Sequence, residues 1–337
     1  MNQRTKQILS YILRFLVLGA ILYWFFGRNA DTLIDTISRL TLPSAALLIV
    51  LGLLYYIADG WSYARCFRGI CSFSILEGTE MAFLTFFATV VTSGAGSIPI
   101  KAYYLHRKGL GISTSAGVFY SNYILHKVST GVLALILLVI SVPLRLYSAD
   151  GLVPYLLYGF AFCVVMNGSM AAAAFIPAFN RLLHRLAGLL PKKLEKQKAK
   201  LNEQLDLLSG EVRTMLMDRK KDLDVTAIHA LKFLSLGILC ACSTRLLFPE
   251  IPFRTPMISM CLVMMLGGAL PNVSGMGGIE FAFRLIFLRF LTEQEMTAAL
   301  LNYRLANYLV PFLISVLVLL KNSRHLQLKE EQTSASE

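Results

Sequence analysis

Long apolar runs alternate with short polar, mostly basic loops along this chain. An α-helix needs roughly 20 predominantly apolar residues to cross the hydrocarbon of a bilayer. Candidate spans by this criterion lie at residues 8–26, 44–57, 128–142, 153–175, 228–248, 256–270 and 296–320. Together with the shorter apolar stretches, they predict an all-α fold, a polytopic membrane helical bundle of about eight transmembrane helices.

Two apolar stretches are interrupted by glycine-rich segments, one in each half of the chain. Residues 81–91 run into Thr-Ser-Gly-Ala-Gly-Ser-Ile-Pro at 92–99, and a short stretch follows at 113–125. In the second half, Pro-Asn-Val-Ser-Gly-Met-Gly-Gly-Ile-Glu at 271–280 precedes an apolar stretch at 281–291. Because glycine and proline interrupt helices, both segments are predicted to be broken. The loop charges leave open whether they cross the membrane or re-enter it.

Composition excludes a purely soluble protein. Of 337 residues, 56% are hydrophobic and 15% are charged, and the mean hydropathy is +0.61. A soluble domain carries about 25% charged residues, so this composition cannot supply a water-facing exterior. We therefore expect a single integral membrane domain over residues 1–320 and a loose polar tail over residues 321–337.

The net charge of +12 is explained by Lys and Arg in cytoplasmic loops, which fix the orientation of the protein in the membrane, and not by nucleic-acid binding. Lys and Arg concentrate in residues 180–226, which predicts a cytoplasmic loop and places the N-terminus and the tail in the cytoplasm of a plasma-membrane protein. Within this loop, a spacing of four and three residues predicts an amphipathic helix or helical pair lying on the bundle. Its apolar face comprises Leu201, Leu205, Leu208, Val212 and Met215.

No pattern of catalytic or metal-binding residues stands out. The six cysteines lack paired CxxC spacing, and the five histidines include no HExxH motif. A phosphate-binding loop and a Ser, His and Asp set are also absent from the sequence. The sequence therefore predicts no catalytic residue, no metal and no cofactor.

The glycine-rich breaks themselves are the candidate site. Irregular backbone inside a membrane persists only where it is buried in protein or lines a wet cavity, and paired breaks in the two halves indicate a binding site. The helix N-termini after the breaks would offer free N–H groups to a phosphate. The alternative is that both breaks are only structural. The candidate head-group residues are Gly94, Gly96, Ser97, Lys101, Ser274, Gly275, Gly277, Gly278, Glu280, Arg284 and Arg304.

Charges inside the apolar segments support a cavity, because each is costly there unless it is paired or hydrated. Glu280 and Arg284 have the spacing of a helical ion pair, while Lys101 and Arg304 add positive charge suited to phosphate. A salt-bridge network that only fixes helices is the alternative. Glu80 and Lys127 are additional candidates for this set, whereas the sequence favours Asp59 as an interfacial cap and Lys232 and Arg245 as side chains that snorkel.

Three segments carry a family resemblance: residues 94–105, residues 271–281 and residues 302–311. In order and spacing they resemble the membrane region of lysylphosphatidylglycerol synthases, a flippase-like family. The resemblance implies a bundle with broken helices around a cavity, lipid movement between leaflets and, in some members, resistance to cationic antimicrobial peptides. Full-length synthases add a soluble aminoacyl-transferase domain, which we expect this chain to lack.

These patterns favour a lipid flippase that moves an anionic or aminoacylated phospholipid, or a related lipid, between leaflets. One alternative is the membrane component of a phosphatidylglycerol lysyltransferase with a separate catalytic partner. Another is a non-transporting subunit that docks a cytoplasmic lipid-modifying enzyme through residues 180–226. The expected partner is a membrane phospholipid, with a homo-oligomer left open and no nucleic acid.

Overall fold

The computed structural model describes most of the chain between residues 29 and 334. The first predicted span, residues 8–26, lies almost entirely outside the described residues, and so does Ser274. The described residues are 29–94, 96–106, 108–141, 153–188, 195–207, 218–270, 272–273 and 275–334, with isolated positions 19, 23, 27, 210 and 216.

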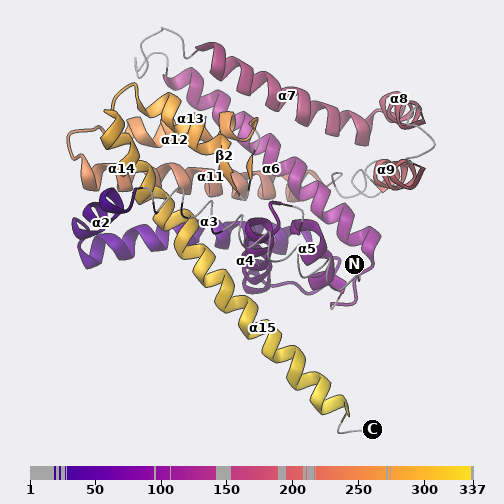
Figure 1. Cartoon of the computed structure of the whole chain (residues 1–337). Coiled ribbons are helices and arrows are strands. Elements are labelled where there is room, and N and C mark those ends of the chain that lie inside the picture. Colours follow the sequence, from indigo (N-terminus) through magenta and orange to yellow (C-terminus); the bar gives the residue numbers. More distant parts are fainter. Residues whose placement is uncertain are drawn as a thin grey trace, which may run out of the picture.

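The architecture is an all-α helical bundle, as predicted (Figure 1). Within the described part of the chain, four helical stretches are long and apolar enough to cross a membrane: Leu42–Cys66, Thr114–Ile140, Arg219–Leu247 and Glu293–Asn322. They belong to α3 (Leu42–Cys66), α6 (Ile112–Ser141), α11 (Arg219–Leu247) and the continuous run α14 (Glu293–Arg304), η4 (Leu305–Leu309) and α15 (Val310–Ser334). The polytopic membrane class is confirmed, and eight spans remain a prediction.

Several helix bounds follow the apolar pattern and others do not. Helix α7 (Val153–Phe175) has the predicted bounds. The stretches predicted separately at 113–125 and 128–142 are one helix, α6, because His126 and Lys127 lower the local hydropathy without breaking the backbone. Helix α15 continues to Ser334, so the polar tail predicted from residue 321 is helical as far as that residue.

Helices α3 and α11 run antiparallel and make the most extensive contact between two helices in the described part of the bundle, and α11 is the more buried of the two. Glycines let helices approach α3 closely. A Cβ on Gly52 would lie 2.3 Å from the carbonyl oxygen of Ala306 in η4, and one on Gly60 would lie 2.3 Å from the backbone nitrogen of Thr79. In a membrane no hydrophobic force drives helices together. Small residues at their crossings let the backbones approach closely and gain van der Waals contact.

One ion pair and one cavity identify the two ends of the bundle. At the Arg65 end, where α3 finishes and α11 begins, Arg65 pairs with Asp224. At the Glu295 end, where α11 finishes and α14 begins, Leu247 and Glu295 line the same cavity. The loop charges predict that the Arg65 end is cytoplasmic.

The first glycine-rich break is a re-entrant hairpin. Helix α4 (Ile75–Val91) runs from the Arg65 end, and α5 (Ser97–His106) returns beside it (Figure 1). Lys108, just after α5, forms an ion pair with Glu77 in the first turn of α4, so both ends of the hairpin lie together. With 17 residues, α4 extends about 25 Å, so the break lies about that far from the Arg65 end.

The second break is a hairpin from the opposite end. Helix α12 (Arg254–Gly267) starts shortly after α11 finishes, and α13 (Gly278–Phe287) ends shortly before α14 begins. Between them, β1 (Asn272–Val273) pairs antiparallel with β2 (Met276–Gly277). Since the end of α11 and the start of α14 line one cavity, α12 and α13 enter and leave at the Glu295 end. Opposed hairpins of this kind are typical of inverted repeats in transporters.

The remaining helices lie at the periphery. Helix α2 (Ala30–Ser38) packs against α14 at the Glu295 end, whereas α8 (Pro177–Gly188) and α9 (Glu195–Leu207) pack against each other after α7 (Figure 1). Helices α8 and α9 thus lie largely within the loop predicted over residues 180–226, and Leu205 of its predicted apolar face is buried. Leu208, Val212 and Met215 lie outside the described residues.

Candidate functional site

The tip of the second hairpin depends on glycine. Gly275 and Gly277 have φ angles of +80° and +106°, which residues with a Cβ rarely adopt. Gly277 donates its N–H to Oε2 of Glu280 at 2.6 Å, so the first turn of α13 is capped by its own glutamate. Gly278, the first residue of α13, is buried.

Glu280 also holds the last membrane helix. Its Oε1 forms an ion pair with Arg304, the last residue of α14, whose side chain is 3% exposed. Nη2 of Arg304 donates to the carbonyl oxygen of Gly275 at 3.2 Å, and the guanidinium lies 5.6 Å from the ring centroid of Tyr308. One arginine therefore ties the tip of the hairpin to α14 and η4.

The predicted helical pair between Glu280 and Arg284 is wrong. Arg284 instead bonds to Glu293 at 2.7 Å, and both of these side chains are largely exposed. Tertiary packing brings buried Arg304 to Glu280, whereas Arg284 lies on the exposed side of α13. Arg284 is thus outside the buried group formed by Glu280 and Arg304.

At the tip of the first hairpin, the backbone turns through Gly94, which has a φ angle of +97°. Gly96 donates its N–H to Oγ1 of Thr92 at 2.5 Å, and the hydroxyl and N–H of Ser97 both donate to the carbonyl oxygen of Gly94. We expected free N–H groups after both breaks. That expectation is wrong for Gly96, Ser97 and Gly277, because side chains and turns already accept their hydrogen bonds.

A second buried ionic group lies between α3 and α11. Lys232 forms an ion pair with Asp59, and the lysine side chain is only 5% exposed. Its ammonium also lies 4.3 Å from the ring centroid of Tyr55. Interpreting Asp59 as an interfacial cap and Lys232 as a snorkelling side chain was therefore wrong: 173 positions separate them, and only packing reveals the pair.

Lys101 joins this group from α5. Its Nζ donates to the hydroxyl of Tyr63 at 2.5 Å and lies 5.5 Å from the ring centroid of Phe119 on α6. Asp59 interacts electrostatically with both lysines, but no described carboxylate lies within ion-pair distance of Lys101. We call Asp59, Lys101 and Lys232 the Lys101 cluster. Its two lysines and one aspartate leave a net charge of one positive unit without a carboxylate partner in the cluster.

Two histidines border the Lys101 cluster. Nδ1 of His126 lies 3.4 Å from Nδ1 of His229, and Nε2 of His229 lies 3.0 Å from Oδ1 of Asn122. His229 is completely buried. Sequence reasoning missed this network because each histidine interrupts an apolar run singly, and the only signal was a polar residue inside such a run.

Aromatic and polar side chains connect the two ionic groups. Tyr55, which faces Lys232, is in edge contact with Tyr56, and the Tyr56 hydroxyl donates to the carbonyl oxygen of Asn307 at 3.3 Å. Phe86 on α4 is in edge contact with Tyr308, which also borders Gly275. The η4 segment lies between the two groups, and both hairpins contact it.

Unpartnered polar atoms mark this same region. Among the described residues, the buried atoms without a hydrogen-bond partner include the Tyr303 hydroxyl, Nε of Arg304 and Oδ1 of Asn307. Buried polar groups are normally bonded, so atoms of this kind indicate a place for water or a ligand group.

The other charged candidates lie nearer the periphery. Glu80 accepts a hydrogen bond from Nδ2 of Asn322 at 2.5 Å, which joins α4 to α15. Nζ of Lys127 would lie 3.9 Å from a Cβ on Gly268, beside the C-terminal end of α12. Arg245 is exposed, as a snorkelling side chain would be.

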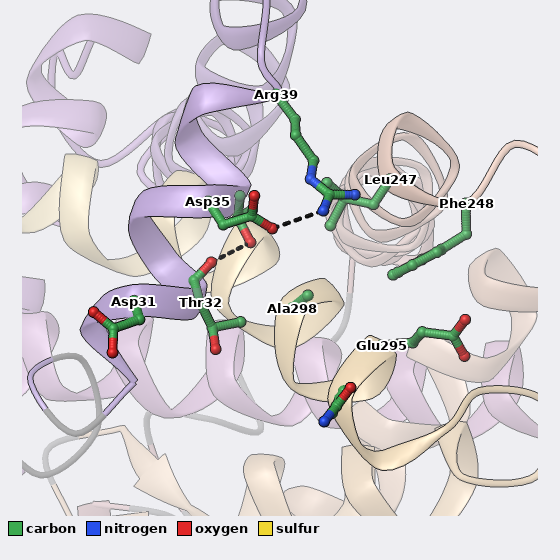
Figure 2. Close-up of a pocket in the computed structure, with 10 residues that line it drawn as sticks. Asp31, Thr32, Asp35, Arg39, Leu247, Phe248, Glu295 and Ala298 are labelled. Carbon is green, nitrogen blue, oxygen red and sulfur yellow. Dashed lines mark hydrogen bonds and ion pairs between the residues drawn. The ribbon is translucent and has the colours of Figure 1, made fainter.

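Two open cavities lie at opposite ends of the bundle. The one at the Glu295 end has a volume of about 420 Å³ and is lined by Asp31 and Asp35 of α2 and by Arg39 just after it. Figure 2 shows Asp35 bonded to Arg39. The one at the Arg65 end has a volume of about 390 Å³. In the described part of the chain, no three metal-binding side chains come together.

Comparison with known families agrees with this architecture. The sequence model of the lysylphosphatidylglycerol synthase TM region matches residues 11–315. The chain belongs to this family. It is therefore a membrane protein related to lysylphosphatidylglycerol synthesis or lipid handling. No functionally curated protein matches the chain.

Proposed function

We propose that this protein binds the polar head group of a phospholipid within the bilayer and moves the lipid between leaflets. The observation that carries the proposal is the positive charge left unbalanced in the Lys101 cluster, which lies between membrane helices toward the Arg65 end. A charge enclosed by membrane helices is costly unless it is paired or hydrated, and a phosphate would supply the missing partner. The proposed substrate is an anionic or aminoacylated phospholipid, or a related lipid.

The opposed hairpins support movement as well as binding. One tip is reached from the Arg65 end and the other from the Glu295 end, and both hairpins contact η4. A head group between them would be close to segments anchored at opposite faces, an arrangement found in many transporters that work by alternating access. In this proposal Gly94, Gly96, Ser97, Gly275, Gly277 and Gly278 shape the two tips. Lys101 would contact the phosphate toward the Arg65 end, and Arg304 would contact it at the tip of the second hairpin as the lipid moves.

In this proposal Glu280 does not pair with Arg284, the partner that its sequence spacing predicted. It holds Arg304 and the backbone of Gly277, so it positions the arginine while the unpartnered Nε remains to donate. Arg284, exposed and bonded to Glu293, has no part in it. We also propose that the protein lies in the plasma membrane with both termini in the cytoplasm.

A proteoliposome assay tests it. Purified protein is reconstituted with a fluorescent anionic phospholipid, and loss of outer-leaflet fluorescence on adding a membrane-impermeant reductant reports movement. We expect Lys101→Gln to reduce the initial rate at least about tenfold, because a charge-assisted bond to phosphate is lost. Lys101→Arg should retain most of the rate.

Lys321→Gln is the matched control, since Lys321 is exposed outside both ionic groups and its replacement removes the same charge. Its rate should equal that of the unaltered protein. An unaltered rate in Lys101→Gln, or no protein-dependent movement of any tested phospholipid, would contradict the proposal.

A further inference from the structure

The cavity at the Arg65 end is a groove on the outer surface of the bundle. It lies where α3 crosses α11 and is lined by Trp61, Arg65, Asp224, Ala227, Ile228 and Leu231. Its residues on α3 are not those of the Lys101 cluster, because Asp59 and Tyr63 face inward. The groove is therefore separate from the proposed translocation site.

The walls of this groove are apolar and face the membrane. Trp61 is 42% exposed and Leu231 is 52% exposed, and both lie on helices of membrane length. Tryptophan is favoured at the interface between hydrocarbon and head groups. An occupant would thus have acyl chains beside Trp61 and Leu231, and its polar part beside Arg65 and Asp224.

The polar end of the groove presents both signs of charge. Nε and Nη2 of Arg65 both donate to Oδ2 of Asp224. In the described part of the chain, neither Nη1 of Arg65 nor Oδ1 of Asp224 has a further partner. The pair can therefore remain intact while Nη1 donates to a phosphate and Oδ1 accepts from an ammonium group.

We propose that this groove binds a phospholipid whose head group carries both a phosphate and a primary ammonium, as in phosphatidylethanolamine. The phosphate contacts Arg65 and the ammonium contacts Asp224. A quaternary choline has no N–H to donate to Asp224, and a glycerol head group has no positive charge. The inference goes beyond the proposed function, because binding here requires no movement of lipid between leaflets.

Trp61 provides a direct readout, since the chain has only two tryptophans, Trp24 and Trp61. In a Trp24→Phe background, the fluorescence of Trp61 is followed in phosphatidylcholine vesicles containing increasing fractions of phospholipid with brominated acyl chains. Bromine quenches tryptophan on contact, so quenching measures occupancy of the groove. Brominated lipids with ethanolamine, choline and glycerol head groups are compared.

We expect brominated phosphatidylethanolamine to reach half-maximal quenching at a mole fraction about fivefold lower than the other two, the effect of one net hydrogen bond. Coincident curves would overturn the proposal, since Trp61 would then contact bulk lipid without selection. This comparison needs no change in the groove, so it does not depend on whether a variant folds.

Variants then assign the two contacts. Asp224→Asn should remove the preference for ethanolamine, and Arg65→Gln should weaken quenching by all three lipids. Arg68→Gln, an exposed arginine one turn further along, is the matched control and should leave all curves unchanged. A preference for ethanolamine that survives in a folded Asp224→Asn protein would overturn the assignment. Lipid movement lost or retained in the proteoliposome assay leaves this result unaffected.

Discussion

The two buried ionic groups differ in how their charges are balanced. Glu280 and Arg304 neutralise each other, and the same two side chains bond to the backbone of Gly277 and Gly275. The Lys101 cluster has two lysines and one carboxylate. Among the described residues, Lys101 contacts only the Tyr63 hydroxyl and the rings of Tyr63 and Phe119. One group closes the tip of a hairpin, whereas the other leaves a positive charge for something else to meet.

This difference predicts opposite effects of the two groups on folding stability. Removing one member of a balanced buried pair leaves the other uncompensated, which costs folding stability. Removing an unbalanced buried charge removes its desolvation cost and should not lower folding stability. The presence of such a charge therefore needs another explanation, such as binding of a ligand of opposite charge. Stability measurements on the two groups should therefore move in different directions.

The largest expected effect is that of Glu280→Gln. The change leaves Arg304 buried without a carboxylate, and we expect it to lower the free energy of unfolding by about 3–5 kcal/mol. Thermal unfolding in detergent measures the loss. The double variant Glu280→Leu with Arg304→Met should recover most of it, because no buried charge remains. A single variant as stable as the unaltered protein would show that this pair does not hold the tip.

A much smaller effect is expected for Lys101→Met, which keeps the aliphatic stem and removes the ammonium. Because no described carboxylate pairs with Lys101, its stability should change by less than about 1 kcal/mol, or increase. The same unfolding measurement applies. A loss as large as that of Glu280→Gln would remove the contrast between the two groups.

The smallest effect is expected for Arg284→Gln. The pair between Arg284 and Glu293 is exposed, and pairs of this kind contribute at most about 1 kcal/mol. We expect little change in unfolding temperature, and the same result for Glu293→Gln. A large loss in either variant would mean that α13 depends on this pair as well as on Glu280.

Local sequence was enough to locate the breaks. Glycines at 94, 275 and 277 have the positive φ angles that only a residue without a Cβ adopts easily, so their positions were readable without neighbours. Glu280, Lys101 and Arg304 were recognisable as charges inside apolar segments. The sequence did not show which of these charges form pairs. The predicted partner of Glu280 was Arg284, one helical turn away, whereas the actual partner is Arg304, 24 residues away.

The same limit explains the missed residues. Asp59 and Lys232 each lie in an apolar helix, where snorkelling or capping explains a single charge. His126 and Lys127 lowered the hydropathy enough to suggest two segments where α6 is continuous. Only the crossing of α3, α6 and α11 shows that these polar residues face one another.

The chain's apolar periods and glycine-rich interruptions, by themselves, determined a membrane bundle with two broken segments, because transfer into lipid and backbone sterics act on each segment alone. Tertiary structure decided that both segments are hairpins entering from opposite ends, and that one ionic group is balanced while the other is not. Charge balance depends on distances between helices far apart in sequence, and such distances exist only once the helices have packed.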